Sequence, residues 1–419
     1  MSRRRLLLSA LGVLFLVLVG QKLQGCATTP ADGDRQQAEP RALVLVSFDG
    51  FRHDYLDRDI DTPALDWMAE GVTARLIPVF PTKTFPNHYS IVTGLYPEQH
   101  GIVGNTMRDP ERLMDGEPAQ FSLSNREAVQ SSAWWGGEPI WVTAERQGVT
   151  TAPVFWPGSE AEIGGVRPTT WEPYNGAKPY LARVQTVLDA LDAGAGYASM
   201  YAEEVDNAGH RYGPDSPEVA EAVSVVDAML DALIDGLRQR GRLDDTDIVV
   251  TSDHGMTGLS RDRVVLLDDA LTVSDHDLIW GEPAGIWPRE GQSASEIVDA
   301  VNALDHVTAY LREDVPARLR YSDNPRIPPV VIIPDEGWSV TSQSYLIRNP
   351  DRPSGGTHGY DNALLSMHGI FLARGPRIRQ DVELETLHIV DLYGIMAEAL
   401  ALDPAENAGD PAAIRRVLR

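Results

Sequence analysis

Short apolar runs rich in β-branched residues recur along the chain from residue 43. The clearest lie at 43–48, 197–201 and 248–252, and each is followed by small and polar residues. Buried runs of this length, bounded by turns, are typical of strands in a parallel sheet. Helical apolar spacing occupies 181–191 and 218–237 between them. This alternation predicts an α/β fold with helices on both faces of a central sheet.

The pattern changes between about 265 and 353 to short pieces in which apolar and polar residues alternate, such as 307–312 and 330–334. Alternation of this kind predicts antiparallel strands. The α/β pattern resumes at 369–373. We therefore predict one folded domain at 41–419, with a mostly parallel central sheet and a smaller antiparallel-rich subdomain inserted at about 265–353.

Residues 1–25 have the pattern of an export signal. Three arginines at 3–5 precede apolar and small residues at 6–19, a stretch shorter than the roughly 20 residues that span a membrane. The arginines also resemble a twin-arginine signal, which would export the protein already folded. Residues 26–40 are small, polar and proline-bearing, as expected of a flexible tether.

The only cysteine, Cys26, follows the signal directly. Bacterial lipoproteins carry their lipidated residue at this point; Leu23 and Gly25 match the lipobox, whereas Gln24 is unusual there. We expect a periplasmic protein anchored to a bacterial membrane through Cys26. The alternative is a soluble periplasmic or secreted protein with an incidental cysteine. A single cysteine excludes an intrachain disulfide.

The formal net charge of −25 argues against a general nucleic-acid-binding surface, because phosphate backbones bind basic patches. A phosphate-containing ligand would have to be attracted locally. Two bound divalent cations would supply that attraction, since a metal is often the largest charge in its surroundings.

Six residues have the types and local spacing that two adjacent divalent ions need. They are Asp49, Asp206, His210, Asp253, His254 and His358. The three acids follow the predicted strands 43–48, 197–201 and 248–252, and ligands of open α/β sheets gather where parallel strands end. The four-residue spacing of Asp206 and His210 places them on one helical face or around a tight turn.

Each of these pieces alone has an ordinary explanation. An Asp-x-x-x-His pair is common on helix surfaces, and Asp-His-Gly is common in turns. The dipeptide Asp-His also occurs at 275–276 and 305–306 without a preceding strand. The combination of three acids after strands and His358 in a glycine-rich loop is harder to explain without a bound metal.

Thr84 directly precedes a helix predicted at 86–93. Spacing alone favours a capping role for Thr84 or Thr82. A helix N-terminus also offers N–H groups to phosphate oxygens. A threonine hydroxyl is a poor nucleophile unless a base or metal activates it, so a nucleophilic role for Thr84 requires the metal site.

The motifs taken together resemble the nucleotide pyrophosphatase/phosphodiesterase family of the alkaline phosphatase superfamily, from about residue 43 to the C-terminus. The resemblance rests on Asp49-Gly50, 83–88, 93–101, Gly104-Asn105, 155–159, Asp206-x-x-Gly209-His210, 252–256 and His358-Gly359. It implies that one zinc ion is held by Asp206, His210 and His358, and a second by Asp49, Thr84, Asp253 and His254. It also implies a covalent phosphothreonyl intermediate on Thr84 and a hydrogen bond from Asn105 to a nonbridging phosphate oxygen.

Four further positions match those that line the base pocket in nucleotide-cleaving relatives: Phe85, Trp156, Glu160 and Tyr174. The resemblance implies that Phe85 and Tyr174 sandwich the base. Stacking tolerates every base, so it predicts nucleotides in general. The alternative is that the aromatic residues belong to the core.

The resulting expectation is a zinc-dependent phosphodiesterase that cleaves nucleoside 5′-phosphodiester or pyrophosphate bonds and releases nucleoside monophosphate. A lipid or choline phosphodiesterase, or a phosphomonoesterase, on the same metals is a second reading. A non-catalytic nucleotide- or zinc-binding lipoprotein is a third, disfavoured because neither a ligand nor the nucleophile is missing.

Overall fold

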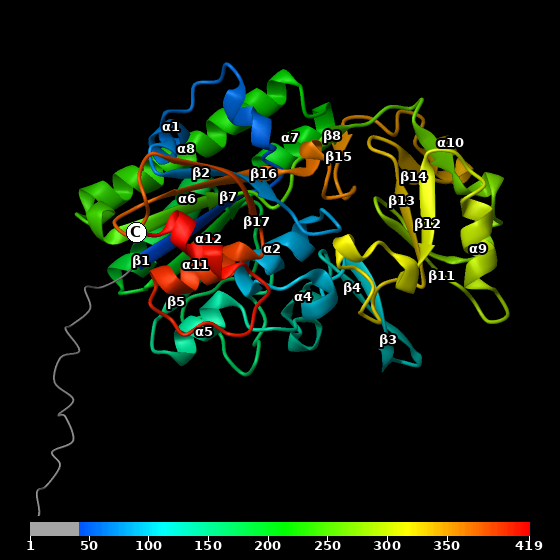
Figure 1. The fold of residues 1–419 in the computed structure, drawn as a ribbon, viewed down its shortest axis with the longest axis horizontal. Coiled ribbons are helices and arrows are strands. Elements are labelled where there is room, and N and C mark those ends of the chain that lie inside the picture. The colour runs from blue at the N-terminus through cyan, green and yellow to red at the C-terminus, as the bar shows by residue number, and fades with distance from the viewer. Residues whose placement is uncertain (1–41) are drawn as a thin grey trace, which may run out of the picture. The chain divides into compact units, whose positions relative to one another are not determined.

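A seven-stranded sheet forms the centre of the computed structural model, which describes residues 42–419 (Figure 1). Its strands follow the order β17-β2-β16-β7-β1-β6-β5. They are β1 (Ala42–Phe48), β2 (Val72–Ile77), β5 (Thr151–Val154), β6 (Tyr197–Ala202), β7 (Thr246–Thr251), β16 (Gly369–Arg374) and β17 (Val382–His388). β16 runs opposite to both of its neighbours, and the other pairs are parallel.

Helices cover both faces of this sheet. They are α1 (Pro63–Ala69), α2 (Thr84–Thr93), α3 (Pro97–His100), α4 (Arg126–Gln130), α5 (Ile140–Arg146), α6 (Tyr180–Asp192), α7 (Glu204–Tyr212), α8 (Pro217–Gln239), α11 (Asp391–Ala399) and α12 (Pro411–Val417). Side chains of β1 alternate between the two faces: Leu43 and Leu45 pack in the core with α2, α5 and α11, and Val44 and Val46 pack with α1, α6 and α8. Because β1 is buried on both faces, it reads as a continuous apolar run.

A separate four-stranded antiparallel sheet with the order β10-β11-β13-β12 lies between β7 and β16 in sequence (Figure 1). Its strands are β10 (Asp277–Ile279), β11 (Ala284–Trp287), β12 (Val307–Leu311) and β13 (Val330–Pro334). Helix α9 (Ala294–Val301) contributes Ile297 and Val301 to the core of this region. The prediction of an α/β fold with an inserted antiparallel-rich subdomain is thus confirmed.

Short elements join the two sheets or lie beside them. They are β3 (Thr106–Met114), β4 (Glu117–Ser122), β8 (Thr257–Gly258), β9 (Val264–Leu266), β14 (Ser339–Thr341), β15 (Gly356–Thr357) and α10 (Gln343–Arg348). β8 follows β7, where the chain leaves the main sheet, and β15 precedes β16, where the chain returns to it. The two short strands pair antiparallel. This pairing brings the chain back immediately before His358.

The predicted export signal at 1–25, the lipidation site Cys26 and the tether at 26–40 lie outside the described residues. Within residues 42–419, the structure has no helix with the length and apolar character needed to cross a membrane. The export signal and the lipid anchor stay predictions from the sequence.

Candidate metal centre and active site

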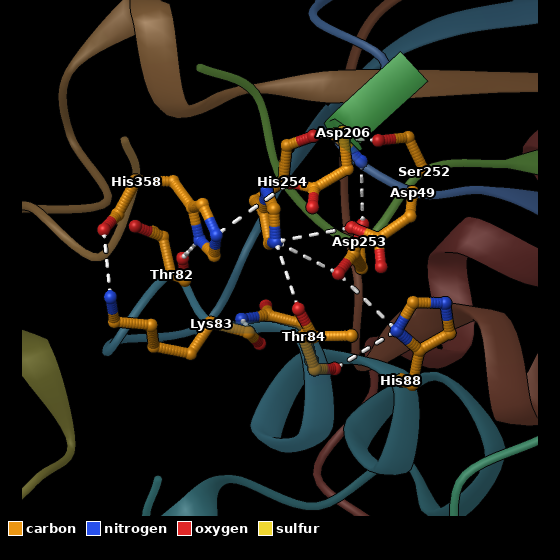
Figure 2. A network of polar contacts seen from close by, with 12 residues as sticks. Asp49, Thr82, Lys83, Thr84, His88, Asp206, Ser252, Asp253, His254 and His358 are labelled. Carbon is orange, nitrogen blue, oxygen red and sulfur yellow. Dashed lines mark hydrogen bonds and ion pairs between the residues drawn. The ribbon is translucent and has the colours of Figure 1, made fainter. Parts of the chain in front are cut away.

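Three neighbouring strands deliver the candidate ligands to one edge of the main sheet. β1 lies between β6 and β7, and all three run in the same direction. Asp49 follows β1 directly, Asp253 follows β7, and Asp206 lies on α7, which begins shortly after β6. Because carboxyl ends of parallel strands meet at the same edge, residues separated by up to about two hundred positions converge there (Figure 2).

One group of ligands, Asp49, Asp253 and His254, forms what we call the inner cluster. His254 Nε2 lies 3.4 Å from Asp49 Oδ1 and 3.0 Å from Asp253 Oδ2. The hydroxyl of Thr84 lies 3.5 Å from the same nitrogen (Figure 2). All three side chains of the cluster are buried. The inner cluster and Thr84 are the residues that the resemblance assigns to one zinc ion.

The outer cluster consists of Asp206, His210 and His358. Asp206 Oδ1 lies 3.4 Å from His210 Nε2 and 3.7 Å from His358 Nε2, and the two imidazole nitrogens are 3.1 Å apart. Ligand atoms about 2.1 Å from one tetrahedral zinc lie about 3.4 Å from each other. The three donor atoms of the outer cluster therefore have the spacing of a zinc site.

The two clusters are in contact. The rings of His254 and His358 stack with centroids 3.5 Å apart at an interplanar angle of 14°. Donor atoms of Asp206, His254 and His358 also lie within 4.8 Å of one another, so His254 faces both clusters. Two cations held here would be neighbours, as a site that contacts both sides of one phosphoryl group requires.

Backbone carbonyls fix the orientation of all three candidate histidine ligands. Nδ1 of His210 bonds the carbonyl of Gly356 at 2.9 Å, and Nδ1 of His358 bonds that of Thr82 at 2.7 Å. His254 Nδ1 bonds the carbonyl of Gly255 at 2.9 Å. Each Nδ1 must carry the proton in these bonds, so each Nε2 keeps a free lone pair toward its cluster.

Three carboxylate oxygens in the clusters are buried and make no hydrogen bond: Asp49 Oδ1, Asp206 Oδ1 and Asp253 Oδ2. Burial and the charges of Asp253 and Asp206 raise the pKa of Asp49. Burial also raises the pKa of Asp206. Buried, crowded carboxylates need a cation or a proton to compensate their charge. The donor set of both clusters thus fits a pair of divalent metal ions.

Thr84 is the first residue of α2, and the cap position belongs to Lys83, which makes no side-chain capping bond. The capping interpretation of Thr84 is therefore wrong. Thr82 does not cap the helix either, because its hydroxyl donates to the carbonyl of Tyr360 and accepts from the N–H of Gly359. The helix begins two residues earlier than predicted and turns the Thr84 hydroxyl toward His254.

A cavity of about 530 Å³ opens over the clusters and contains Asp49, Thr84, Asp206, His210 and His358 in its wall. Asn105 also lines it. The Asn105 Oδ1 atom accepts a hydrogen bond of 2.9 Å from the N–H of Phe85. This bond identifies Oδ1 as the acceptor and leaves the Nδ2 group as the donor available to a ligand.

The four predicted base-pocket residues line this same cavity: Phe85, Trp156, Glu160 and Tyr174. Tyr174 is 40% exposed and Phe85 is partly buried, so both offer ring surface. Trp156 is buried and donates from Nε1 to the carbonyl of His88 at 3.0 Å. Glu160 is held by Arg126, by Gln130 and by the N–H of Tyr174.

Three residues around the clusters were not predicted as site residues. Tyr201 donates from its hydroxyl to Asp49 Oδ2 at 2.6 Å. Lys83 Nζ donates to the carbonyl of His358 at 3.0 Å (Figure 2). His88 Nδ1 lies 3.3 Å from Asp253 Oδ2, and His88 Nε2 lies 2.8 Å from the hydroxyl of Ser47. These residues position the candidate ligands.

A family model described as "Type I phosphodiesterase / nucleotide pyrophosphatase" matches residues 43–361. The chain belongs to this family. Ectonucleotide pyrophosphatase/phosphodiesterase family member 5 of Homo sapiens is 37% identical over 382 residues, which cover 89% of this chain and 77% of that protein. Venom phosphodiesterase of Naja atra is 35% identical over 411 residues, covering 94% of this chain. The chain spans about half the length of this venom phosphodiesterase, 48%.

Solved structures of the phosphodiesterase/nucleotide pyrophosphatase family show the same fold. Murine ectonucleotide pyrophosphatase/phosphodiesterase 5 was solved as an inactive threonine-to-alanine variant in complex with AMP. It matches with a TM-score of 0.84 at 36% identity, over 90% of this chain and 100% of the murine chain. The human counterpart gives the same TM-score, identity and coverage.

Proposed function

We propose that the chain is a two-zinc nucleotide phosphodiesterase/pyrophosphatase that hydrolyses nucleoside 5′-phosphodiester or pyrophosphate bonds and releases nucleoside monophosphate. The observation that carries this proposal is the placement of the Thr84 hydroxyl 3.5 Å from His254 Nε2, beside two contacting clusters of metal-ligand atoms. Family membership supports the reaction class.

The clusters would hold the two ions as the resemblance assigns them, with Asp206, His210 and His358 at one and Asp49, Thr84, Asp253 and His254 at the other. Bound zinc ions would supply Lewis-acid chemistry, making the hydroxyl more acidic and neutralising phosphate charge. Within the chain, the Nδ1 bonds of the histidines hold each Nε2 toward its cluster, where it would bind the ion, and the Tyr201 hydroxyl holds the Asp49 carboxylate.

Thr84 would act as the nucleophile. A bond forms between its Oγ1 and the phosphorus as the bond from phosphorus to the leaving group breaks; the hydroxyl proton passes to solvent water, and the leaving group departs with the electron pair. Water then hydrolyses the phosphothreonine, which releases nucleoside monophosphate and restores the hydroxyl. Asn105 Nδ2 would donate to a nonbridging oxygen of the phosphoryl group.

Phe85 and Tyr174 would hold the base, because both rings line the cavity that contains Thr84. The complex of the murine relative with AMP supports a nucleotide ligand. Trp156 and Glu160 would shape the pocket, since Trp156 is buried and the Glu160 carboxylate is bound by protein groups.

Substitution of the nucleophile tests the proposal. Thr84→Ala is expected to lower turnover of the p-nitrophenyl ester of a nucleoside monophosphate by at least about 10³-fold, because the covalent step is lost. Thr84→Ser keeps a hydroxyl and serves as the matched control, with partial activity. Retained turnover in Thr84→Ala, at unchanged zinc content and circular dichroism, would falsify the nucleophile assignment.

Cleavage rates of the same enzyme preparation on three substrates distinguish the alternative functions. We expect the nucleotide aryl ester to be cleaved faster than a simple phosphomonoester or glycerophosphocholine. Preference for glycerophosphocholine would indicate a choline phosphodiesterase, and preference for the monoester would indicate a phosphatase. A zinc-loaded protein that binds nucleotide but cleaves none of the three would indicate a binding protein.

A further inference from the structure

The loop at 101–105 joins α3 to β3 and ends at Asn105, the candidate hydrogen-bond donor to the phosphoryl group. Two atoms of Asn105 are held directly. Its Oδ1 accepts from the N–H of Phe85 at 2.9 Å, and its carbonyl accepts from the N–H of Leu123 at 3.0 Å. A donor of this kind works only when it lies within hydrogen-bond distance of the oxygen on which charge develops. The position of the loop that carries Asn105 therefore bears on the reaction.

A segment of the inserted region, 319–327, packs against the main domain. Its side chains Leu319, Tyr321 and Ile327 are buried in the core that contains α2, α5 and α11, whereas the inserted antiparallel sheet has a core of its own. The ring of Tyr321 contacts that of Phe80 edge to face, with centroids 5.2 Å apart. This segment is thus fixed to the domain that carries the candidate active site.

Tyr321 holds the loop at Val103, two residues before Asn105. The Tyr321 hydroxyl donates to the carbonyl of Val103 at 2.8 Å. Tyr321 is 5% exposed and Val103 is 2% exposed. Because the bond is buried, water does not readily replace it, and its loss leaves a buried carbonyl without a donor. The hydroxyl therefore fixes the middle of the loop.

Arg326 holds the chain on both sides of Asn105. Its Nη1 donates to the carbonyls of Gly101 at 2.9 Å and Trp134 at 2.8 Å, and its Nη2 donates to that of Ala133 at 3.0 Å. Its Nε donates to the carboxylate of Asp109 on β3 at 3.0 Å. A planar guanidinium with four partners fixes their relative positions more strictly than a flexible ammonium group does.

We propose that Tyr321 and Arg326 are positioning residues for the reaction, which hold the loop at 101–105 so that Asn105 Nδ2 faces the phosphoryl group. The inference rests on the proposed function, in which Asn105 is that donor, and adds that the inserted region sets its position. Asn105 lines the active-site cavity and a smaller cavity of about 130 Å³, and of these two Tyr321 and Arg326 line only the smaller. A displacement of about 1 Å costs a catalytic group much of its effect.

Conservative substitutions of the two residues test the proposal. Tyr321→Phe removes the hydroxyl and keeps the ring, and it is expected to lower kcat on the nucleotide aryl ester about fivefold. Arg326→Lys keeps the charge but loses the planar fork, and about a tenfold loss is expected. KM should change less than threefold, because the lost interaction strengthens in the transition state. A higher KM at unchanged kcat would overturn the proposal.

A double-mutant cycle with Asn105→Ala shows whether the effect passes through Asn105. Asn105→Ala alone is expected to lower kcat about 10²-fold. In that background, Tyr321→Phe and Arg326→Lys should each lower kcat by less than a further twofold, because the donor that they position is gone. Equal losses in both backgrounds would overturn the positioning role, while turnover by the unsubstituted enzyme still upholds the proposed function. An unchanged kcat in Asn105→Ala would overturn the positioning role together with the donor role of Asn105, and Thr84→Ala would still test the nucleophile.

Tyr393→Phe is the matched control, because Tyr393 is buried in the same core and its hydroxyl accepts from the N–H of Ala405 at 2.8 Å. Its kcat should equal that of the unsubstituted enzyme. Hydrogen exchange of the amides at 101–105 measures the loop without turnover. Exchange should be faster in Tyr321→Phe and Arg326→Lys and unchanged in Tyr393→Phe, at unchanged circular dichroism. Unchanged exchange in the first two variants would contradict the positioning role.

Discussion

The inner and outer clusters use similar ligands but are built differently. The inner cluster comes from the ends of two hydrogen-bonded strands, β1 and β7, and its side chains are at most 2% exposed. The outer cluster comes from a helix, α7, and from the loop that returns after the inserted subdomain. His210 is 41% exposed there. The inner cluster is therefore buried beside Thr84, whereas the outer cluster is open to solvent at His210 and lines the active-site cavity.

Turnover should therefore fall more when a ligand of the inner cluster is replaced than when a ligand of the outer cluster is replaced. Asp253→Asn is expected to reduce turnover of the nucleotide aryl ester by about 10³-fold or more, because a metal ion bound beside Thr84 would lose one of its charged ligands. The substitution is nearly isosteric, and the bond from the Gly50 N–H to Oδ1, 3.1 Å long, can persist. Activity and metal content per chain are the measurements.

Asp275→Asn is the matched control for Asp253→Asn. It changes the same residue type in the same Asp-His dipeptide, at an exposed position in the inserted region. We expect unchanged activity and metal content. If Asp253→Asn kept two metal ions and near-normal turnover, the inner cluster would not be the site of Thr84 activation.

Loss of an outer ligand should have a smaller effect. His210→Ala is expected to lower turnover about 10²-fold and to release one metal ion while the other stays bound. In the unsubstituted enzyme, a graded series of chelator concentrations should likewise remove the outer ion first, since His210 is exposed. Metal analysis after gel filtration measures both, with the exposed His388→Asn as the control. Release of both ions together would contradict the expectation that the inner cluster keeps its ion when the outer cluster loses one.

The same structural difference explains what the sequence could predict. Asp49 and Asp253 follow apolar runs that form neighbouring parallel strands, so strand ends alone brought them together. His358 comes after a long inserted region; its glycine-rich loop made it a candidate ligand, but only the family resemblance assigned it to the same ion as Asp206 and His210. Spacing wrongly predicted a capping role for Thr84. A threonine near the start of a helix has the same local sequence pattern whether its hydroxyl caps the backbone or, as here, faces His254.

Tyr201 is a residue that the sequence pattern could have found. It lies on β6 opposite Ser47 of β1, two residues before Asp49, so its position beside the carboxylate follows from strand register. Its hydroxyl bond opposes the effect of burial, which raises the pKa of Asp49. Without that bond, the Asp49 pKa rises further, and a proton competes better with the inner metal ion.

Tyr201→Phe is thus expected to lower turnover about tenfold, the smallest of these effects, by weakening metal binding at the inner cluster. Since the Asp49 pKa rises, the loss should grow as the pH falls and shrink as the pH rises or zinc is added. A pH profile of turnover at two zinc concentrations measures this, with the exposed Tyr212→Phe as the control. A loss independent of pH and zinc would mean that Tyr201 supports packing alone. A loss that zinc reverses would show that the buried inner cluster also depends on a single neighbouring hydroxyl to keep its carboxylate charged.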